Sequence, residues 1–221
     1  TFMGWSTKPM QSVSPQYEAE EKITVNGNVD LYAVVFNRAT ETDLTEDQLP
    51  QVDIYKYKQV IFVGDSRTEF MENVLTGMGE SATKNVKFVC SAGKKLNWLT
   101  TTGWSQLYAM VQKDTNSILS KKTAVIFNFG VNDLSDYADY VEYYNWIAPQ
   151  LKSKGCELYF MSVNPVNRLM LSNTGRGDRS EAAVRSFNEY MKSNLSSDYT
   201  YIDMYSYLKS TGYSFASDKY G

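Results

Sequence analysis

The sequence contains no histidine among its 221 residues. Histidine is the side chain that most often accepts a proton from a catalytic hydroxyl near neutral pH, so a catalytic serine in this sequence lacks its usual partner. Histidine and cysteine are also common zinc ligands, and the two cysteines are too far apart in the sequence to form a CxxC pair. We therefore predict no metal site and no cofactor.

A surplus of positive charge is missing as well. The 22 Lys and Arg residues stand against 25 Asp and Glu residues, and the basic residues are scattered. Nucleic acids and anionic membranes both select clustered positive charge, so neither is a predicted partner. Long apolar runs are also missing, and no stretch is long enough to span a bilayer. The first residue is Thr1 rather than methionine, and we interpret this start as a cut point.

Cysteine occurs only twice, at Cys90 and Cys156. Both lie in apolar, strand-like segments, and two cysteines are a poor basis for a disulfide framework. We predict two buried free thiols, which pack as small hydrophobic side chains. The cysteine count therefore does not identify the redox compartment.

From Lys58 onward, the sequence alternates short apolar runs with helical patterns. Strands are predicted at residues 60–63, 86–90, 124–127, 158–161 and 199–202. Helices are predicted near residues 70–78, 104–113, 135–153 and 180–195. This alternation predicts a three-layer α/β/α domain, with a five-stranded, mostly parallel sheet and helices on both faces. Ligands of such sheets bind beyond the carboxyl ends of the strands.

The first 57 residues have a different character. Residues 1–36 predict a short β-rich extension, and residues 37–57 are polar and acidic, which favours a linker or a surface segment packed on the next domain. The main domain is then predicted over residues 58–221. The β-like segments of the extension lie at residues 2–5, 23–25 and 31–36.

Ser66 lies just past the first predicted strand of the main domain, after Gly64 and Asp65 of the string Gly64-Asp65-Ser66, and begins a helix. A hydroxyl there lies at the open edge of the sheet. The positive end of the helix dipole favours the negative charge that develops when a hydroxyl attacks a carbonyl. The alternative is a helix N-cap, a position that Ser and Asp occupy routinely.

Two further elements follow the next two strands. Gly93 comes after the second strand, and its backbone N–H can approach a substrate closely because the residue has no side chain. Asn132 follows the third strand, in the string Gly130-Val131-Asn132-Asp133, and its amide can donate a hydrogen bond to an oxyanion. A glycine or an asparagine in a turn is common. The three elements in this order nevertheless predict one shared site.

These three elements resemble the successive blocks of the SGNH hydrolases, also called GDSL-like lipases or acylhydrolases. Ser66 matches the first block, Gly93 the second and Asn132 the third. The resemblance runs from about Val60 to the end of the sequence and implies the flavodoxin-like SGNH fold. The string from Phe62 to Thr68 is similar to that of bacterial members that are often secreted.

The resemblance implies hydrolysis of an ester. Ser66 would attack the acyl carbon, and the N–H groups of Ser66 and Gly93 would hold the oxyanion together with the Asn132 amide. The implied substrate is a small acyl ester or an acylated glycan. The residues that would support the motif are Gly64, Asp65, Gly130 and Asp133.

For three polar residues, we favour a structural or solvated role over a catalytic one. We expect Asp133 to shape its loop rather than to take part in catalysis. For Arg67 and Arg176, we favour a structural or solvated role over contact with substrate.

The fourth block of the family, Asp-x-x-His after the fifth strand, is not found in the sequence. In the family, this histidine takes the proton of the serine and the aspartate orients the histidine. Here the fifth strand ends near Asp203, and three residues after Asp218 stands Gly221. Either the polypeptide continues beyond Gly221 with this block, or the chain is a natural pseudoenzyme. We favour the first, because the last helix expected of the fold is missing too.

The N-terminal segment carries a second resemblance. Phe2-x-Gly4-Trp5, with Tyr17, Ile23-Thr24 and Leu31-Tyr32-Ala33-Val34, is similar to the second half of an internalin-type B repeat, a β-grasp-like module of bacterial surface proteins. It implies an extracellular or cell-surface setting with cell-wall association. An unrelated β-hairpin extension is the alternative.

Two classes of function therefore stay open. One is a secreted bacterial serine esterase that removes acyl groups, such as acetyl groups of a carbohydrate. The other is a non-catalytic SGNH-like surface or glycan-binding module. A flavodoxin-like nucleotide binder is disfavoured, because the sequence has no Gly-rich phosphate loop.

Overall fold

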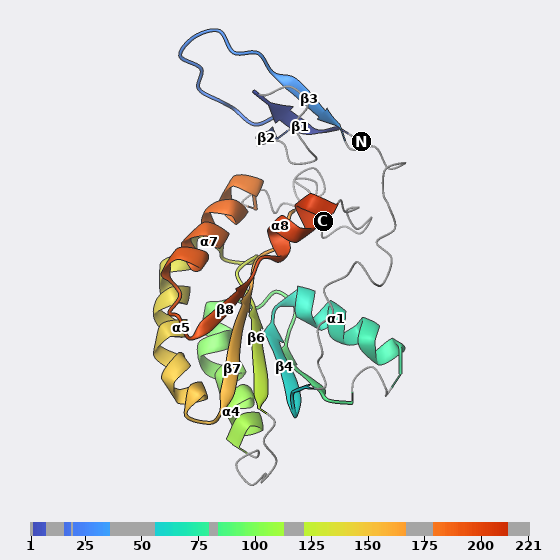
Figure 1. The fold of residues 1–221 in the computed structure, drawn as a ribbon, viewed down its shortest axis with the longest axis vertical. Coiled ribbons are helices and arrows are strands. Elements are labelled where there is room, and N and C mark those ends of the chain that lie inside the picture. Colours follow the sequence, from blue (N-terminus) through green and yellow to red (C-terminus); the bar gives the residue numbers. More distant parts are fainter. Residues whose placement is uncertain are drawn as a thin grey trace.

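The strands of the protein form two separate sheets in the computed structural model. The structure describes residues 2–7, 16–18, 20–35, 56–79, 84–112, 122–166 and 179–211. The larger sheet has five strands in the order β5-β4-β6-β7-β8, and every neighbouring pair is parallel (Figure 1). Its strands are β4 (Gln59–Gly64), β5 (Val86–Cys90), β6 (Thr123–Asn128), β7 (Cys156–Met161) and β8 (Tyr199–Ile202). The predicted parallel α/β sheet is confirmed.

Apolar side chains on both faces explain why these segments form a buried parallel sheet. On one face, Ile61 and Val63 of β4 are fully buried; on the other face, Val60 of β4 is buried together with Ala124 of β6. Strands covered on both faces need such near-continuous apolar runs. The central strands are therefore the most strongly apolar ones.

Helices cover both faces of this sheet, which gives the three layers. Helices α4, α5 and α7 lie on one side and α1 on the other (Figure 1). On the three-helix side, Leu107, Ile147 and Phe187 are buried in one core. The bounds are α1 (Ser66–Gly77), α4 (Trp104–Gln112), η5 (Leu134–Asp136), α5 (Tyr137–Lys152), α7 (Glu181–Asn194) and α8 (Met204–Thr211).

Two helical segments differ from the sequence-based expectation. No helix is predicted between the strand at 86–90 and the helix near 104–113, but residues 94–103 contain α3 (Leu96–Trp98) and the π-helical turn η4 (Leu99–Gly103). The threonines there have low helix propensity. In the structure, the hydroxyls of Thr100 and Thr101 donate to the Asn97 carbonyl at 3.0 and 2.9 Å. Tertiary burial of Leu99 then outweighs propensity.

Helix α8 is the second difference, because no helix was predicted after the fifth strand. Asp203 begins it: its carboxylate accepts from the Ser206 N–H at 3.0 Å, and its carbonyl accepts from the Tyr207 N–H at 3.1 Å. Lys209 of α8 is paired with Glu181 of α7 at 2.7 Å, and both side chains are buried. This helix is fixed by contacts with α7 that sequence periodicity does not reveal.

The smaller sheet is antiparallel, with strands in the order β2-β1-β3. Its strands are β1 (Phe2–Ser6), β2 (Tyr17–Glu18) and β3 (Tyr32–Val35). The predicted β-like segment at 23–25 is not a strand, and none of its side chains is buried, with Val25 52% exposed. Residues 36–55, which include most of the predicted linker, lie outside the described residues.

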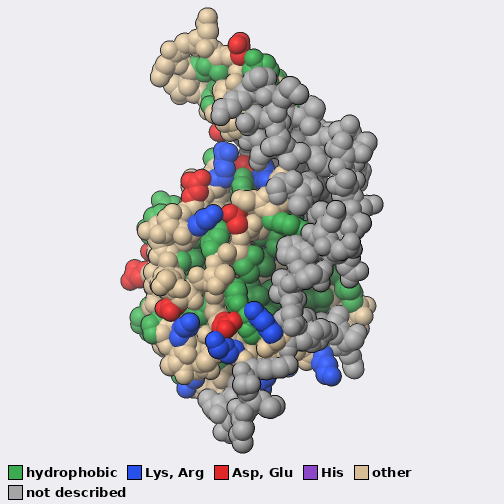
Figure 2. Space-filling view, in the orientation of Figure 1, with side chains coloured by type: hydrophobic (Ala, Val, Ile, Leu, Met, Phe, Trp, Pro, Cys, Tyr) green, Lys and Arg blue, Asp and Glu red, His purple; other side chains and the backbone are tan. Residues whose placement is uncertain are grey.

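Surface composition agrees with the scattered charge of the sequence. Figure 2 shows basic and acidic side chains interspersed over the face in view. Among the described residues, no helix is long and apolar enough to cross a membrane. Cys90 and Cys156 are both free thiols, although Cys156 is buried and Cys90 only partly so.

Candidate active site

The three candidate loops leave the same edge of the sheet. Gly64 at the end of β4 is in register with Cys90 of β5 on one side and with Asn128 of β6 on the other. The Ser91 N–H donates to the Gly64 carbonyl, and the Asp65 N–H donates to the Asn128 carbonyl, both at 3.4 Å. The segments that contain Ser66, Gly93 and Asn132 therefore start from one level of three adjacent strands.

Glycine at position 64 is required by close packing. A Cβ there would overlap the Thr68 side chain and lie 2.9 Å from the Asn128 carbonyl oxygen. The Asn128 side chain in turn donates to the Thr68 hydroxyl at 3.3 Å. A bare backbone thus lets β4 pass directly into α1 beside the end of β6.

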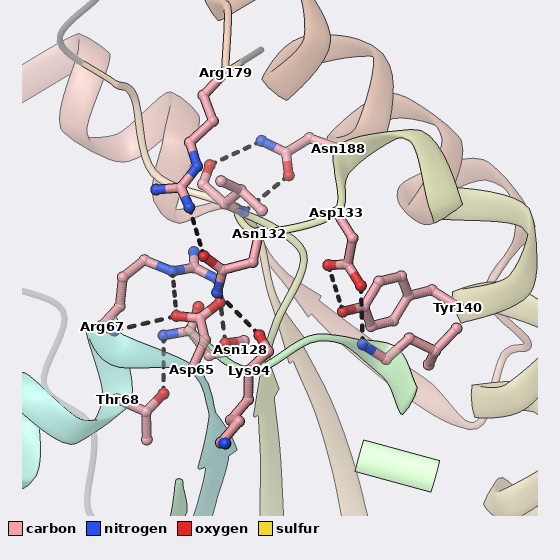
Figure 3. A network of polar contacts seen from close by, with 12 residues as sticks. Asp65, Arg67, Thr68, Lys94, Asn128, Asn132, Asp133, Tyr140, Arg179 and Asn188 are labelled. Carbon is pink, nitrogen blue, oxygen red and sulfur yellow. Dashed lines mark hydrogen bonds and ion pairs between the residues drawn. The ribbon is translucent and has the colours of Figure 1, made fainter. Parts of the chain in front are cut away.

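Asp65 is the N-cap of α1, with a carboxylate that accepts from the Arg67 N–H at 3.1 Å. The side chain of Arg67 returns to the same carboxylate through Nε at 3.0 Å and Nη2 at 2.9 Å (Figure 3). Nη2 also donates to the Asn128 carbonyl at 3.1 Å. Asp65 is fully buried, so this ion pair anchors the start of the helix. The structural interpretation of Arg67 agrees with these contacts, whereas Arg176 lies outside the described residues.

Ser66 is the first residue of α1 and is partly exposed. The N-cap alternative therefore holds for Asp65 of this string, which caps α1, but not for Ser66, which is already inside the helix. No hydrogen bond ties up its hydroxyl within the described ranges of the chain. The hydroxyl therefore lies at the positive end of a twelve-residue helix.

Gly93 adopts a left-handed backbone conformation, with φ of +70°. A Cβ there would have no atom within 4 Å, so backbone conformation rather than crowding favours glycine. The residue is exposed. Its N–H is open to a ligand at the end of β5.

Asn132 joins the third loop to the second. Its Nδ2 donates to the Lys94 carbonyl at 2.9 Å, one residue after Gly93 (Figure 3). Its Oδ1 accepts from Arg179 Nη2 at 2.6 Å. Both ends of the carboxamide are thus held, while one Nδ2 hydrogen is not used in the contact with Lys94.

Arg179 is the residue of this site that sequence reasoning missed. It directly precedes Ser180, the N-cap of α7, and lies 47 residues from Asn132 in the sequence. No local pattern marks it, since an arginine before a helix is ordinary. Only the packing of α7 against the end of β6 brings the two side chains together.

The contacts of Asp133 suit the loop-shaping role that we predict for it. It is buried, and its carboxylate accepts from the Leu96 N–H and from the Tyr140 hydroxyl, both at 2.8 Å. Burial raises the pKa of Asp133, and these two hydrogen bonds partly offset the shift. The residue therefore pins the start of α3 and the Asn132 loop to α5.

A hollow of about 320 Å³ lies on the Asn132 side of the site. Lys95, Asn132, Arg179 and Tyr137 are among its lining residues, and Ser66 is not. Within the described residues, no group of three or more His, Cys, Asp or Glu side chains could hold a metal ion. The chemistry available at this edge is that of a hydroxyl, amide donors and cations.

Comparisons with known proteins give a limited result. The structure is similar to that of TesA at a TM-score of 0.36 and 14% identity, over 61% of this chain and 71% of that one. It is also similar to a lipase/acylhydrolase from Enterococcus faecalis at a TM-score of 0.42 and 15% identity, over 68% and 78% of the two chains. No family model and no curated protein matches the sequence. At this level of similarity, residue roles must rest on the geometry of this chain.

Proposed function

We propose that the protein is a serine esterase of the SGNH type, with Ser66 as the nucleophile. The observation that carries this proposal is the contact of Asn132 with the Lys94 carbonyl, at the level where β4, β5 and β6 end in register. It brings the Asn132 carboxamide to the loop of Gly93, next to the strand that leads to Ser66. A hydroxyl and several amide donors at one edge suit the attack on an ester carbonyl.

In the proposed reaction, Ser66 Oγ forms a bond to the acyl carbon as its proton passes to an acceptor. The carbonyl oxygen becomes an oxyanion, held by the N–H groups of Ser66 and Gly93 and by Asn132 Nδ2. The bond to the alcohol then breaks, and the alcohol leaves with the proton. Water hydrolyses the acyl-serine by the same steps and releases the acid.

No described residue of the site is suited to accept the proton of Ser66. A lysine would need strong desolvation to be neutral, and a carboxylate is a weak base for a hydroxyl. The proposal therefore includes a histidine of an Asp-x-x-His block that is not among these 221 residues. Without such an acceptor, we expect these 221 residues to hydrolyse esters poorly.

For the substrate, we propose a small acyl ester, with acetyl groups of a carbohydrate as the specific case. The proposed setting is the outside of a bacterial cell, with attachment to the cell wall through a surface module at the N-terminus. The antiparallel β2-β1-β3 sheet is compatible with such a module.

Ser66→Ala in the full-length gene product is the decisive test, with p-nitrophenyl acetate as substrate. We expect Ser66→Ala to abolish turnover above background and Asn132→Ala to lower kcat by roughly 10² to 10³, as for other oxyanion donors. Ser91→Ala, on the neighbouring loop, is the matched control and should keep activity within about twofold, as is usual for a substitution outside such features. Equal turnover by the unmodified protein and Ser66→Ala would reject the esterase and favour the non-catalytic glycan-binding module.

The role of the acceptor can be tested on the 221-residue chain itself. A fluorophosphonate should label Ser66 slowly, and added imidazole should speed the labelling because it supplies the missing base. Mass spectrometry locates the label. Labelling that is unaffected by imidazole would contradict the proposed role of a histidine. Labelling that persists in Ser66→Ala would contradict Ser66 as the nucleophile.

A further inference from the structure

We propose that Arg179 is a positioning residue, which fixes and polarises the Asn132 carboxamide so that Nδ2 can hold an oxyanion. This inference rests on the esterase proposal for its catalytic consequence. The observation behind it is the 2.6 Å hydrogen bond from Arg179 Nη2 to Asn132 Oδ1 (Figure 3). The contact lies beside the hollow that both residues line.

The two partners of Asn132 leave its amide only one favourable orientation. The Lys94 carbonyl can only accept, and it faces Nδ2 at 2.9 Å. The Arg179 guanidinium can only donate, and it faces Oδ1. A flipped amide would set oxygen against oxygen and N–H against N–H, so the flipped state loses two hydrogen bonds. Nδ2 is therefore directed to the loop of Gly93.

The positive charge of Arg179 also strengthens Asn132 as a donor. A hydrogen bond from a charged group is shorter and about twice as strong as a neutral one. By drawing electron density toward Oδ1, it makes the Nδ2 hydrogens better donors, because bonds in a chain polarise one another. The effect is largest when the second Nδ2 hydrogen meets a negatively charged oxygen.

Helix α7 holds Arg179 in place. Ser180 caps the helix by accepting from the Ala183 N–H at 3.0 Å. Asn188 clamps the helix to the chain after β7, with two 2.8 Å hydrogen bonds to the Val163 backbone. The Phe187 ring packs directly on Gly130, two residues before Asn132. The backbones that bear Arg179 and Asn132 are thus tied together independently of their side-chain contact.

A double-mutant cycle in the full-length gene product tests the inference. We expect Arg179→Met to lower kcat about ten- to a hundredfold with KM within about threefold, which is less than the loss of an oxyanion donor itself. In the Asn132→Ala background, Arg179→Met should cost no more than about twofold, since the two residues act as one unit. Arg179→Lys keeps the positive charge but not the planar guanidinium, so its kcat should be higher than that of Arg179→Met and lower than that of the unmodified protein. Arg185→Met on the same helix is the matched control and should leave kcat unchanged.

Side-chain amide NMR provides a readout that does not depend on activity. Arg179→Met should shift the Asn132 Nδ2 signals and speed rotation of its amide. The Asn188 signals should stay unchanged, because both ends of that amide bond to Val163. If Ser66→Ala is as active as the unmodified protein, the esterase fails, and the Asn132 signals alone decide whether Arg179 positions this residue. Unshifted Asn132 signals, or losses from Arg179→Met and Asn132→Ala that multiply fully, would overturn the inference.

Discussion

Gly130 shows how much a single residue can decide in the candidate site. Its φ of +121° is a conformation that side chains disfavour, and a Cβ would overlap the Phe187 ring of α7. Gly130→Ala should therefore lower the free energy of unfolding by about 2 to 4 kcal/mol, from steric overlap and backbone strain together. Urea denaturation measures this change.

The control for Gly130 is a glycine without these constraints. Gly77 ends α1, and a Cβ there would meet nothing within 4 Å. Gly77→Ala should be neutral or stabilise the protein by up to about 1 kcal/mol. Adding Phe187→Leu to Gly130→Ala should recover part of the loss, because it relieves the overlap but not the strain. Equal stability of the two alanine variants would contradict the role assigned to Phe187.

Residues of the site divide into those that the sequence predicts and those that only packing creates. Ser66, Gly93 and Asn132 follow successive strands, so their placement at one edge follows from a parallel sheet. Whether these residues catalyse a reaction stays a prediction. The contacts of Arg179 with Asn132 and of Phe187 with Gly130 were not predicted, because they depend on how α7 packs against the end of β6. Local periodicity contains no information about such contacts.

At the scale of elements, a polar cluster joins the amino ends of three strands. Glu157 at the start of β7 accepts from the Tyr57 hydroxyl, just before β4, at 2.6 Å, and from Lys122, just before β6, at 2.9 Å. These two hydrogen bonds lower the pKa of Glu157 to about 2. The cluster lies at the end of the sheet opposite to the candidate site.

The lowered pKa of Glu157 predicts a dependence of stability on pH. Its folded pKa lies below the unfolded value of about 4.3, so its contribution is present above that pH and is lost as the pH falls toward 2. Glu157→Gln should flatten the fall of Tm between about pH 4.5 and pH 2. The side chain is 31% exposed, so we expect an effect of only about 1 kcal/mol or less.

Thermal unfolding followed by circular dichroism across this pH range is the measurement. Glu142→Gln on the exposed side of α5 is the control, because Glu142 forms no ion pair in the described part of the chain. Its profile should follow that of the unmodified protein. If the Tm of Glu157→Gln falls as steeply with decreasing pH as that of the unmodified protein, the Glu157 cluster is not the source of the pH dependence.

Elements with strong apolar patterns were predicted well, and those fixed by tertiary contacts were not. The predicted strands at 86–90 and 199–202 coincide with β5 and β8, and the helix at 180–195 matches α7 within its caps. By contrast, η4 and α8 depend on buried Leu99 and on the Lys209–Glu181 ion pair. Those contacts form only when distant segments have already packed.

At the scale of the whole molecule, the two sheets differ in how well they are supported. The five-stranded sheet is backed by a large core, with β6 between two neighbours. The three-stranded sheet contains the two-residue strand β2, and Phe2 and Tyr32 are each at least 40% exposed. Since the described sheets share no strand, the larger one does not hold the smaller one by backbone hydrogen bonds.

Amide hydrogen exchange on the intact chain should reveal this difference. We expect the amides of β4 and β6 to exchange only by global unfolding and those of β1 and β3 to exchange orders of magnitude faster by local opening, because local stability follows buried contacts. Site-resolved exchange at neutral pH tests this, with the paired edge strand β8 as an internal reference between the two extremes. Protection of β3 equal to that of β6 would mean that the small sheet unfolds only with the main domain. If β4 and β6 are the most protected strands, as we expect, the loops of Ser66 and Asn132 start from the most rigid strands of the molecule. Pre-organised hydrogen-bond donors require such support.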